Sequence, residues 1–303
     1  MIYSEISSNK RKTALLITFF LVLIIALGYV FSLYANQPLL LPIAVGISVA
    51  MSFFSYFFSD KIVLAMSQAH EIQRADDEEL YRTVENLAIA AGLPTPKIYL
   101  IDDTAPNAFA TGRDPQHAVV AITTGLRQKL TKPELEGVMA HELSHIGNYD
   151  IRLSTIIVVL VGVVTLLADW MLRMSFYGRR RSDSSEGGQV GAIIMIVGVV
   201  LALLSPIAAT LIQLAISRKR EYLADASGAL LTRYPEGLAS ALKKIAEDSE
   251  PLEAANKATA HLYIVNPLKE HSGSSNGVSW FANLFQTHPP IQERIERLEE
   301  MEK

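Results

Sequence analysis

Four long apolar runs constrain this chain more than any other feature of its sequence. The first covers residues 13–35 without a charged side chain, and the second covers residues 39–58. Each is long enough to cross a bilayer as a helix, which takes about 20 residues. Residues 36–38 between them read Asn-Gln-Pro and break the apolar pattern. The two runs therefore predict a tight transmembrane hairpin at residues 13–58, after a short N-terminal segment, 1–12.

A second pair of apolar runs lies in the middle of the chain. The third covers residues 153–172, with Asp169 near its end, and the fourth covers residues 190–216. A polar loop rich in Ser and Gly separates them, which is typical of a flexible connection. We expect a second transmembrane hairpin at residues 153–216. A buried hairpin of a soluble domain is the alternative, and the sequence leaves it open.

The composition agrees with a membrane protein. Half of the residues are hydrophobic and 19% are charged, whereas soluble domains have about 25% charged residues. A cleaved signal peptide fits the first run poorly, because its apolar core would be only about 7–15 residues long. The net charge of −4 is too small to indicate nucleic acid as a partner. The absence of cysteine excludes disulfides and thiolate metal sites.

Basic residues near the ends of the runs predict the orientation in the membrane. The side that would hold both chain termini carries the larger set, so we expect it to face the cytoplasm. The cluster Arg179–Arg181, on the other side, runs against this tendency. The larger set is Lys10, Arg11, Lys12, Lys61, Arg152, Arg218, Lys219 and Arg220, and the smaller one is Arg173 with Arg179–Arg181.

The polar segment at residues 59–152 has the pattern of a small α+β unit. Apolar spacing predicts a helix over residues 76–91 with Gly92 as its C-cap. Alternation predicts strands at 97–102, 107–112 and 117–125. A second helix has a clear start, because Thr131 and Glu134 form a capping box and Pro133 fits the first turn.

The C-terminal segment, residues 217–303, is expected to be helical. It contains a helix over residues 217–234 and another that Pro235 opens. Ser and Gly predict a loop at residues 271–277. The end of the chain forms an amphipathic helix, with Ile291, Ile295 and Leu298 on one face.

The stretch His-Glu-Leu-Ser-His at residues 141–145 carries the chemistry. Positions i and i+4 of a helix lie on one face, so His141 and His145 can bind one metal ion. Glu142 turns about 100° away from His141 and can reach a water held by that ion. This is the physical sense of the H-E-x-x-H motif, two ligands and one general base. Two solvated histidines on a surface helix are the alternative.

A catalytic zinc ion usually has three protein ligands and one open position. Position 151, where a third histidine could follow the motif, is Ile. Glu221 can complete the site, and Asp225 one turn later can accept a hydrogen bond from a ligand histidine. Acids on an exposed helix are more often only solvated. An even number of membrane crossings between His145 and Glu221 would return both to the same side, roughly 8–12 Å from the apolar runs.

With these residues in view, the chain resembles the HtpX group of M48 membrane metallopeptidases, which are related to the Ste24 and Oma proteases. The order of motifs carries the resemblance: an N-terminal hairpin, Asn-Ala-Phe-Ala-Thr-Gly at 107–112, the motif at 140–150, a second hairpin, residues 217–229 and the stretch at 287–295 that begins Thr-His-Pro-Pro. The resemblance implies zinc bound by His141, His145 and Glu221, with Glu142 as the base. Only four apolar runs are present, so we do not expect the seven-span chamber of the Ste24 relatives.

Further positions match motifs of this group. Asn107 and Ala108 fall on an expected edge strand, which can pair with an extended substrate backbone. A turn-flanking asparagine is the alternative. His288 resembles a histidine near the active site that could stabilise the oxyanion or occupy the open metal position. It could also only begin a helix. We expect Arg294 in the same motif to be structural.

The expected fold is a mainly α integral membrane protein with four transmembrane helices. Its cytosolic part would be an α+β metalloprotease domain of the gluzincin type with a small β-sheet, built from residues 59–152 and 217–303. The resemblance implies a zinc endopeptidase of the bacterial cytoplasmic membrane that removes damaged or misfolded membrane proteins. A zinc-bound scaffold or holdase, or a hydrolase of a non-peptide amide, are the alternatives. The natural substrates and the oligomeric state are not predicted.

Overall fold

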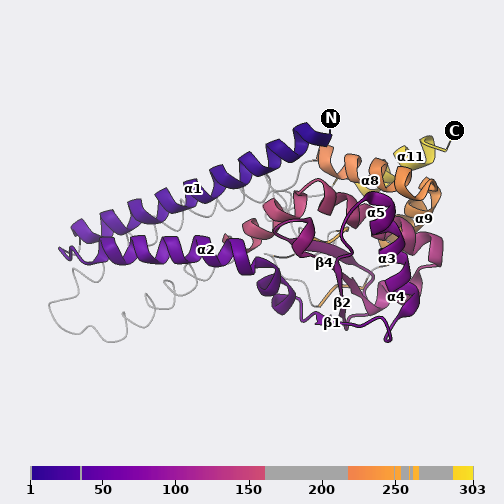
Figure 1. Ribbon diagram of the computed structural model, residues 1–303, viewed down its shortest axis with the longest axis horizontal. Helices are drawn as coiled ribbons and strands as arrows, with labels where there is room; N and C mark the ends of the chain where they lie inside the picture. The colour runs from indigo at the N-terminus through magenta and orange to yellow at the C-terminus, as the bar shows by residue number, and fades with distance from the viewer. Residues whose placement is uncertain are drawn as a thin grey trace, which may run out of the picture.

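Two long helices form a hairpin that projects from the rest of the molecule (Figure 1). The computed structural model describes residues 2–34, 36–160, 218–248, 250–253, 259, 262–265 and 289–302. Helix α1 spans Ile2–Tyr34 and α2 spans Leu40–Met66. Asn36, with a φ of 51°, reverses the chain between them. Helix α1 begins well before the first apolar run, so residues 2–12 extend the same helix toward the globular part.

Among the described residues, one helix is long and apolar enough to cross a membrane. It covers Leu41–Met66, with a mean hydropathy of 1.8. The third apolar run is described only to residue 160, and the fourth lies outside the described residues. The prediction of four transmembrane helices is therefore not confirmed and stays a prediction. A mainly helical chain with a small sheet is confirmed.

The globular part contains a four-stranded sheet in the order β1-β2-β4-β3. Strands β2 and β4 are parallel, and the two outer pairs are antiparallel. The strands are β1 (His70–Glu71), β2 (Lys97–Ile101), β3 (Ala108–Gly112) and β4 (Ala118–Thr123). The short strand β1 was not predicted. Strand β4 ends earlier than predicted because Thr123 caps a short helix, α4 (Thr124–Lys129).

The two faces of the sheet are both covered. On β4, Val120 and Ile122 join the main core with helices α3 (Glu78–Ala91) and α5 (Lys132–Gly147), while Val119 and Ala121 join a second core. That second core includes Val63, from the last turns of α2. Alternation of side chains along a strand produces this division. The hairpin of α1 and α2 is thus anchored directly to one face of the sheet.

Helix α5 (Lys132–Gly147) lies at the centre of the globular part. The predicted capping box is present: the Glu134 carboxylate accepts a hydrogen bond of 2.7 Å from the Thr131 backbone N–H. Around α5 pack α3 (Glu78–Ala91), α8 (Arg218–Thr232) and α9 (Pro235–Glu247), and α11 (Ile291–Glu300) packs against α9. The predicted helices at these positions are confirmed.

The hairpin also contacts the chain that follows α5. Residues 150–160 are helical, and Leu153 and Ile156 pack against Leu16 and Phe20 of α1. Figure 1 shows the start of α1 beside α8. The N-terminal helix therefore reaches the elements that carry the candidate metal ligands.

Candidate metal centre and active site

Two histidines of α5 face each other at the centre of the candidate site. The Nε2 atoms of His141 and His145 lie 3.1 Å apart, and their rings are nearly perpendicular, at 89°. Residues four apart lie on one face of a helix, so α5 alone fixes this arrangement. The side chain of His141 is buried and that of His145 is 15% exposed.

Helix α8 brings a carboxylate to the same point. Glu221 places Oε2 3.8 Å from His141 Nε2 and Oε1 3.6 Å from His145 Nε2. The ligand atoms that these three residues offer lie within 4.8 Å of one another. Glu221 is far from the motif in the sequence, but packing of α8 on α5 brings its carboxylate to the two histidines.

These atoms fit a tetrahedral metal ion. Bonds of about 2.0–2.1 Å hold the ligand atoms of such an ion roughly 3.3 Å apart. The three separations, 3.1, 3.6 and 3.8 Å, lie around that value. Two imidazoles and one carboxylate also leave a position for water, as catalytic sites require.

The outer nitrogens of both histidines contact acids. His141 Nδ1 lies 2.9 Å from Asp225 Oδ1, and His145 Nδ1 lies 3.0 Å from Asp150 Oδ2. An acid at Nδ1 holds the Nδ1–H tautomer, which leaves Nε2 with a lone pair for a metal. Asp225 therefore lies where the sequence predicted. Asp150 was not singled out, although a carboxylate directly after the motif was a possible signal.

The charges of the site favour a cation between the histidines. Burial lowers the pKa of His145, but the hydrogen bond with Asp150 and the charge of Glu221 outweigh it and raise the pKa to about 9. Burial lowers the pKa of His141 to about 4. A histidine must lose its extra proton to bind a metal. The acids that favour this proton on His145 also attract a divalent cation, which can replace the proton.

Glu142 is buried beside the two histidines but is not one of the three grouped ligands. Burial raises the pKa of its carboxyl to about 7, against the charge of His145, which lowers it. The carboxylate also accepts a hydrogen bond from the backbone of Ala110 on β3. A carboxylate with a pKa near neutrality has the properties of a general base.

Arg294 of α11 holds the back of the site. This fully buried guanidinium donates to both oxygens of Asp225, at 2.8 and 2.6 Å, and to the Ile264 carbonyl at 3.0 Å. Its Nη1 atom lies 3.7 Å from Glu221 Oε2. Burial on its own raises the pKa of Asp225, but the charge and the hydrogen bonds of Arg294 outweigh it and hold the pKa below its ordinary value, so Asp225 stays ionised.

The edge strand β3 lies along the site, with Asn107 just before it. The Asn107 side-chain amide donates to the Val265 carbonyl at 2.9 Å, and the Ala108 carbonyl accepts from the Ile264 N–H at 3.0 Å. The start of the strand edge is thus paired with the chain's own segment 262–265. Because alternate residues of an edge strand turn their backbone groups outward, Ala110 is the next position along this edge.

Comparison with known proteins identifies the family. The model of peptidase family M48 matches residues 74–302 of the chain. The chain belongs to peptidase family M48. It is therefore a metalloprotease, and its relatives are membrane proteases. Helix α2, which is long and apolar enough to cross a membrane, agrees with this.

Several relatives of this M48 peptidase match over nearly their whole length. A protease HtpX homologue of Dictyoglomus turgidum is 50% identical over 99% of this chain and 94% of the relative. Homologues of Tropheryma whipplei and Ligilactobacillus salivarius are 46% and 45% identical, each over 99% of this chain and over 99% and 100% of the relative. Among solved structures, S. mikatae Ste24p matches with a TM-score of 0.49 and 20% identity, over 98% of this chain and 67% of that one.

One residue that the sequence predicted at the candidate site lies outside the part of the chain that the structure describes. His288 lies outside the described residues, so its suggested roles stay predictions. The structure brings the other predicted residues together: His141, Glu142 and His145 from α5, and Glu221 and Asp225 from α8, with Asn107 and Ala108 at β3. Asp150 and the contacts of Arg294 are what sequence reasoning missed.

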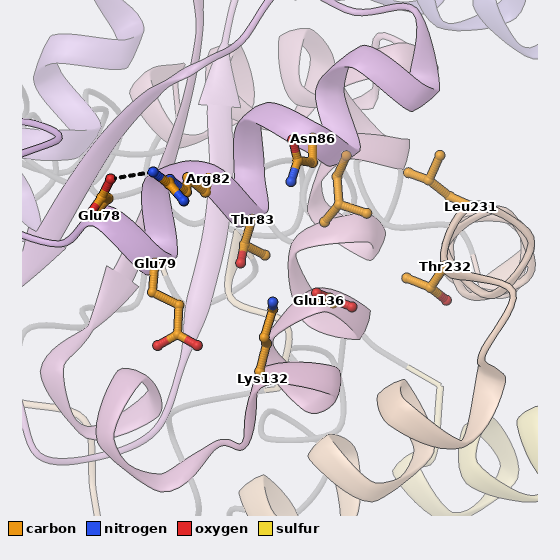
Figure 2. A pocket seen from close by; sticks show the side chains of 10 residues that line it. Glu78, Glu79, Arg82, Thr83, Asn86, Lys132, Glu136, Leu231 and Thr232 are labelled. Atoms are coloured by element: carbon orange, nitrogen blue, oxygen red, sulfur yellow. Dashed lines mark ion pairs between the residues drawn. The ribbon is translucent and has the colours of Figure 1, made fainter.

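A separate cavity of about 560 Å³ lies between α3, the start of α5 and the end of α8 (Figure 2). Its wall carries acids and bases together, among them Glu79, Arg82, Lys132 and Glu136. Glu78 and Arg82 form an ion pair of 2.7 Å at its rim. It contains none of the candidate metal ligands, so it is separate from the candidate metal centre.

Proposed function

We propose that this M48 peptidase is a zinc endopeptidase that cleaves damaged or unfolded membrane proteins at the cytoplasmic membrane of a bacterium. The observation that carries the proposal is the pair of facing Nε2 atoms, His141 and His145, with the Glu221 carboxylate beside them. Zinc suits two imidazoles and a carboxylate better than the hard divalent cations do, because those prefer oxygen ligands. One ion per chain is expected.

The proposed reaction is hydrolysis of a peptide bond. Bound zinc supplies a Lewis acid that polarises the scissile carbonyl and lowers the pKa of water. Glu142 takes a proton from the attacking water and passes it to the leaving amine. Its burial and its raised pKa, about 7, support both transfers near neutral pH. Asp225 and Asp150 keep the two histidines in the tautomer that binds metal.

The substrate is proposed to bind as an added strand at the edge of β3. Ala108 belongs to this edge, although its carbonyl already accepts from Ile264. Asn107 then fixes the segment beside this edge, because its side-chain amide donates a hydrogen bond to the Val265 carbonyl. Backbone pairing reads little of the sequence, which suits a protease that removes many different damaged proteins.

The active site is proposed to lie on the cytoplasmic side, just above the bilayer. Basic side chains stack on aromatic rings where the hairpin meets the globular part: Arg113 lies 5.4 Å from the Phe57 ring centroid and Lys61 lies 5.5 Å from that of Phe58. Aromatic rings gather at membrane interfaces, and basic residues gather on the cytoplasmic side. The four spans and the two-part domain at residues 59–152 and 217–303 belong to the same proposal.

A role in quality control is supported by the relatives, which are named protease HtpX homologues. A scaffold that only holds zinc, and a hydrolase of lipid amides, are the competing functions. The scaffold hypothesis does not explain why the carboxyl of Glu142 is buried beside the two histidines with a raised pKa. The hypothesis of a lipid amide hydrolase depends only on the proposed closeness of the site to the bilayer.

Glu142→Gln tests the proposal. Purified in detergent, this variant should bind about one zinc ion per chain and should lose cleavage of casein by a factor of at least ~100, because a general base contributes roughly 10²–10⁴-fold. Glu136→Gln, on the same helix but outside the metal site, is the matched control and should cleave normally. Casein cleavage at the wild-type rate by Glu142→Gln, or cleavage that survives removal of zinc by a chelator, would contradict the mechanism. Release of fatty acid from lipid extracts without casein cleavage would favour the amide hydrolase.

A further inference from the structure

A buried asparagine of the membrane hairpin contacts the surroundings of the metal site. Asn9 of α1 is fully buried. Its Nδ2 group donates to the Asn148 carbonyl at 3.1 Å and to Asp150 Oδ1 at 2.6 Å. Its Oδ1 atom accepts from Arg220 Nη1 at 3.4 Å. One side chain thus touches the start of α8, which carries Glu221, and the segment directly after α5, which carries the two histidines.

Asp150 links Asn9 to His145, because each of its two carboxylate oxygens contacts one of them. Its Oδ1 atom lies 2.6 Å from Asn9 Nδ2 and 3.5 Å from Arg220 Nε, and its Oδ2 atom lies 3.0 Å from His145 Nδ1. Tyr149, with a φ of 60°, turns the chain so that Asp150 can point back at the histidine five residues earlier. Both oxygens of the Asp150 carboxylate are therefore engaged, one by the hairpin and one by the candidate ligand.

We propose that Asn9 is a positioning residue for the metal site: by holding Asp150 it fixes the ring of His145, so that docking of α1 completes the site. This inference rests on the proposed role of His145 as a metal ligand. Outer partners of ligand histidines typically contribute 10–100-fold to metal affinity. Asn9 acts one contact further out, so its contribution should be smaller, roughly 3–10-fold.

The chemistry of the contact supports positioning over simple packing. Apolar residues such as Leu16 and Phe20 already pack α1 against the helix at 150–160. A buried amide adds a requirement for particular partners, because its polar atoms are costly to leave without hydrogen bonds. Helix α1 can therefore satisfy Asn9 only in the position that also orients Asp150. A chain whose hairpin is not docked should bind metal more weakly.

Asn9→Ala in the full chain, purified in detergent and stripped of metal, tests this inference. We expect zinc affinity, measured by competition with a chromophoric chelator, to fall roughly 3–10-fold. With Co²⁺ bound, the visible absorption bands should shift, because they report the geometry of the ligands. Thr13→Ala is the matched control, since Thr13 is buried on the same helix one turn later and its hydroxyl forms no hydrogen bond with any residue that the structure describes. It should change neither readout.

The inference is wrong if Asn9→Ala keeps wild-type affinity and spectrum, or if Thr13→Ala reduces affinity equally. An exchange of the two side chains covers the case in which Asn9→Ala does not fold. Asn9→Asp alone places two carboxylates together and should weaken zinc binding, whereas Asn9→Asp with Asp150→Asn restores a carboxylate–amide pair and should recover part of it. Absence of that recovery would also contradict the inference.

His145→Ala separates this inference from the proposed function. If His145→Ala still binds zinc with wild-type affinity, the ligand assignment fails. If His145→Ala loses zinc while the Asn9 and Asp150 variants bind it normally, the ligand assignment stands and only the role of Asn9 fails.

Discussion

Gly228 of α8 lies directly against the backbone of His141 on α5. A methyl group at residue 228 would lie 3.0 Å from the His141 nitrogen and 3.3 Å from the Ala140 carbonyl carbon. These are backbone atoms, which cannot rotate away as a side chain does. The absence of a side chain at this position is what allows α8 to present Glu221 and Asp225 to the two histidines.

Gly228→Ala should therefore separate the two helices by a few tenths of an ångström. Alanine favours a helix over glycine by about 1 kcal/mol, but overpacking costs about 1–3 kcal/mol, so we expect a net loss of stability. Zinc affinity should fall as well, because the ligands come from both helices. Urea denaturation followed by circular dichroism, with a zinc titration, measures both effects.

Gly147→Ala is the control for this substitution. Its methyl group would meet only the Leu93 side chain, at 3.7 Å, which is an ordinary contact. That variant should be as stable as the wild type or slightly more stable. Equal stability and zinc affinity of the Gly228 and Gly147 variants would contradict the close contact.

Arg294→Met should destabilise the protein strongly. It removes the partner of Asp225 and leaves a buried carboxylate, which typically costs about 3–5 kcal/mol. Arg294→Lys keeps the charge but not the two parallel hydrogen bonds, so it should recover only part of the loss. The free energy of unfolding in detergent is the measurement.

Arg297→Met is the matched control on the same helix. Arg297 is half exposed and pairs with Glu293 one turn away at 2.9 Å, and such surface pairs contribute less than about 1 kcal/mol. A loss in Arg294→Met no greater than that in Arg297→Met would show that the buried pair does not hold the site together.

Glu134 should make stability depend on pH. Burial raises the pKa of Glu134, but hydrogen bonds from Lys244, Ser240 and Thr131 outweigh it and lower the pKa to about 2. A carboxyl with a lowered pKa stabilises the folded state fully above its unfolded value, about 4.3. That contribution is lost as the pH falls toward 2. It is on the order of 3 kcal/mol at most.

The free energy of unfolding of Glu134→Gln, compared with the wild type across pH, measures this effect. The difference should be constant above about pH 5.5 and should shrink steadily between about pH 4.5 and pH 2. In a Lys244→Gln background the difference should be smaller, because one of the hydrogen bonds is already absent. A difference that stays the same at low pH would rule out the lowered pKa.

The sequence by itself determined the local parts of this protein. The capping box starts α5 where Thr131 and Glu134 predict it, and the spacing of His141 and His145 alone makes their nitrogens meet. Apolar periodicity also predicted α3, Pro235 predicted the start of α9, and alternation predicted the strands other than β1. These features depend on residues a few positions apart, and their geometry follows from the helix and strand repeats.

Only the tertiary structure decided which distant residues surround the candidate metal ligands. Asn9 reaches Asp150 across 141 positions of sequence, and Arg294 reaches Asp225 across 69. The pairing of segment 262–265 with Ala108 likewise follows no local pattern. Such contacts form because packed helices bring side chains together at points that no repeat in the sequence encodes, and each buried polar group must then find its partner there.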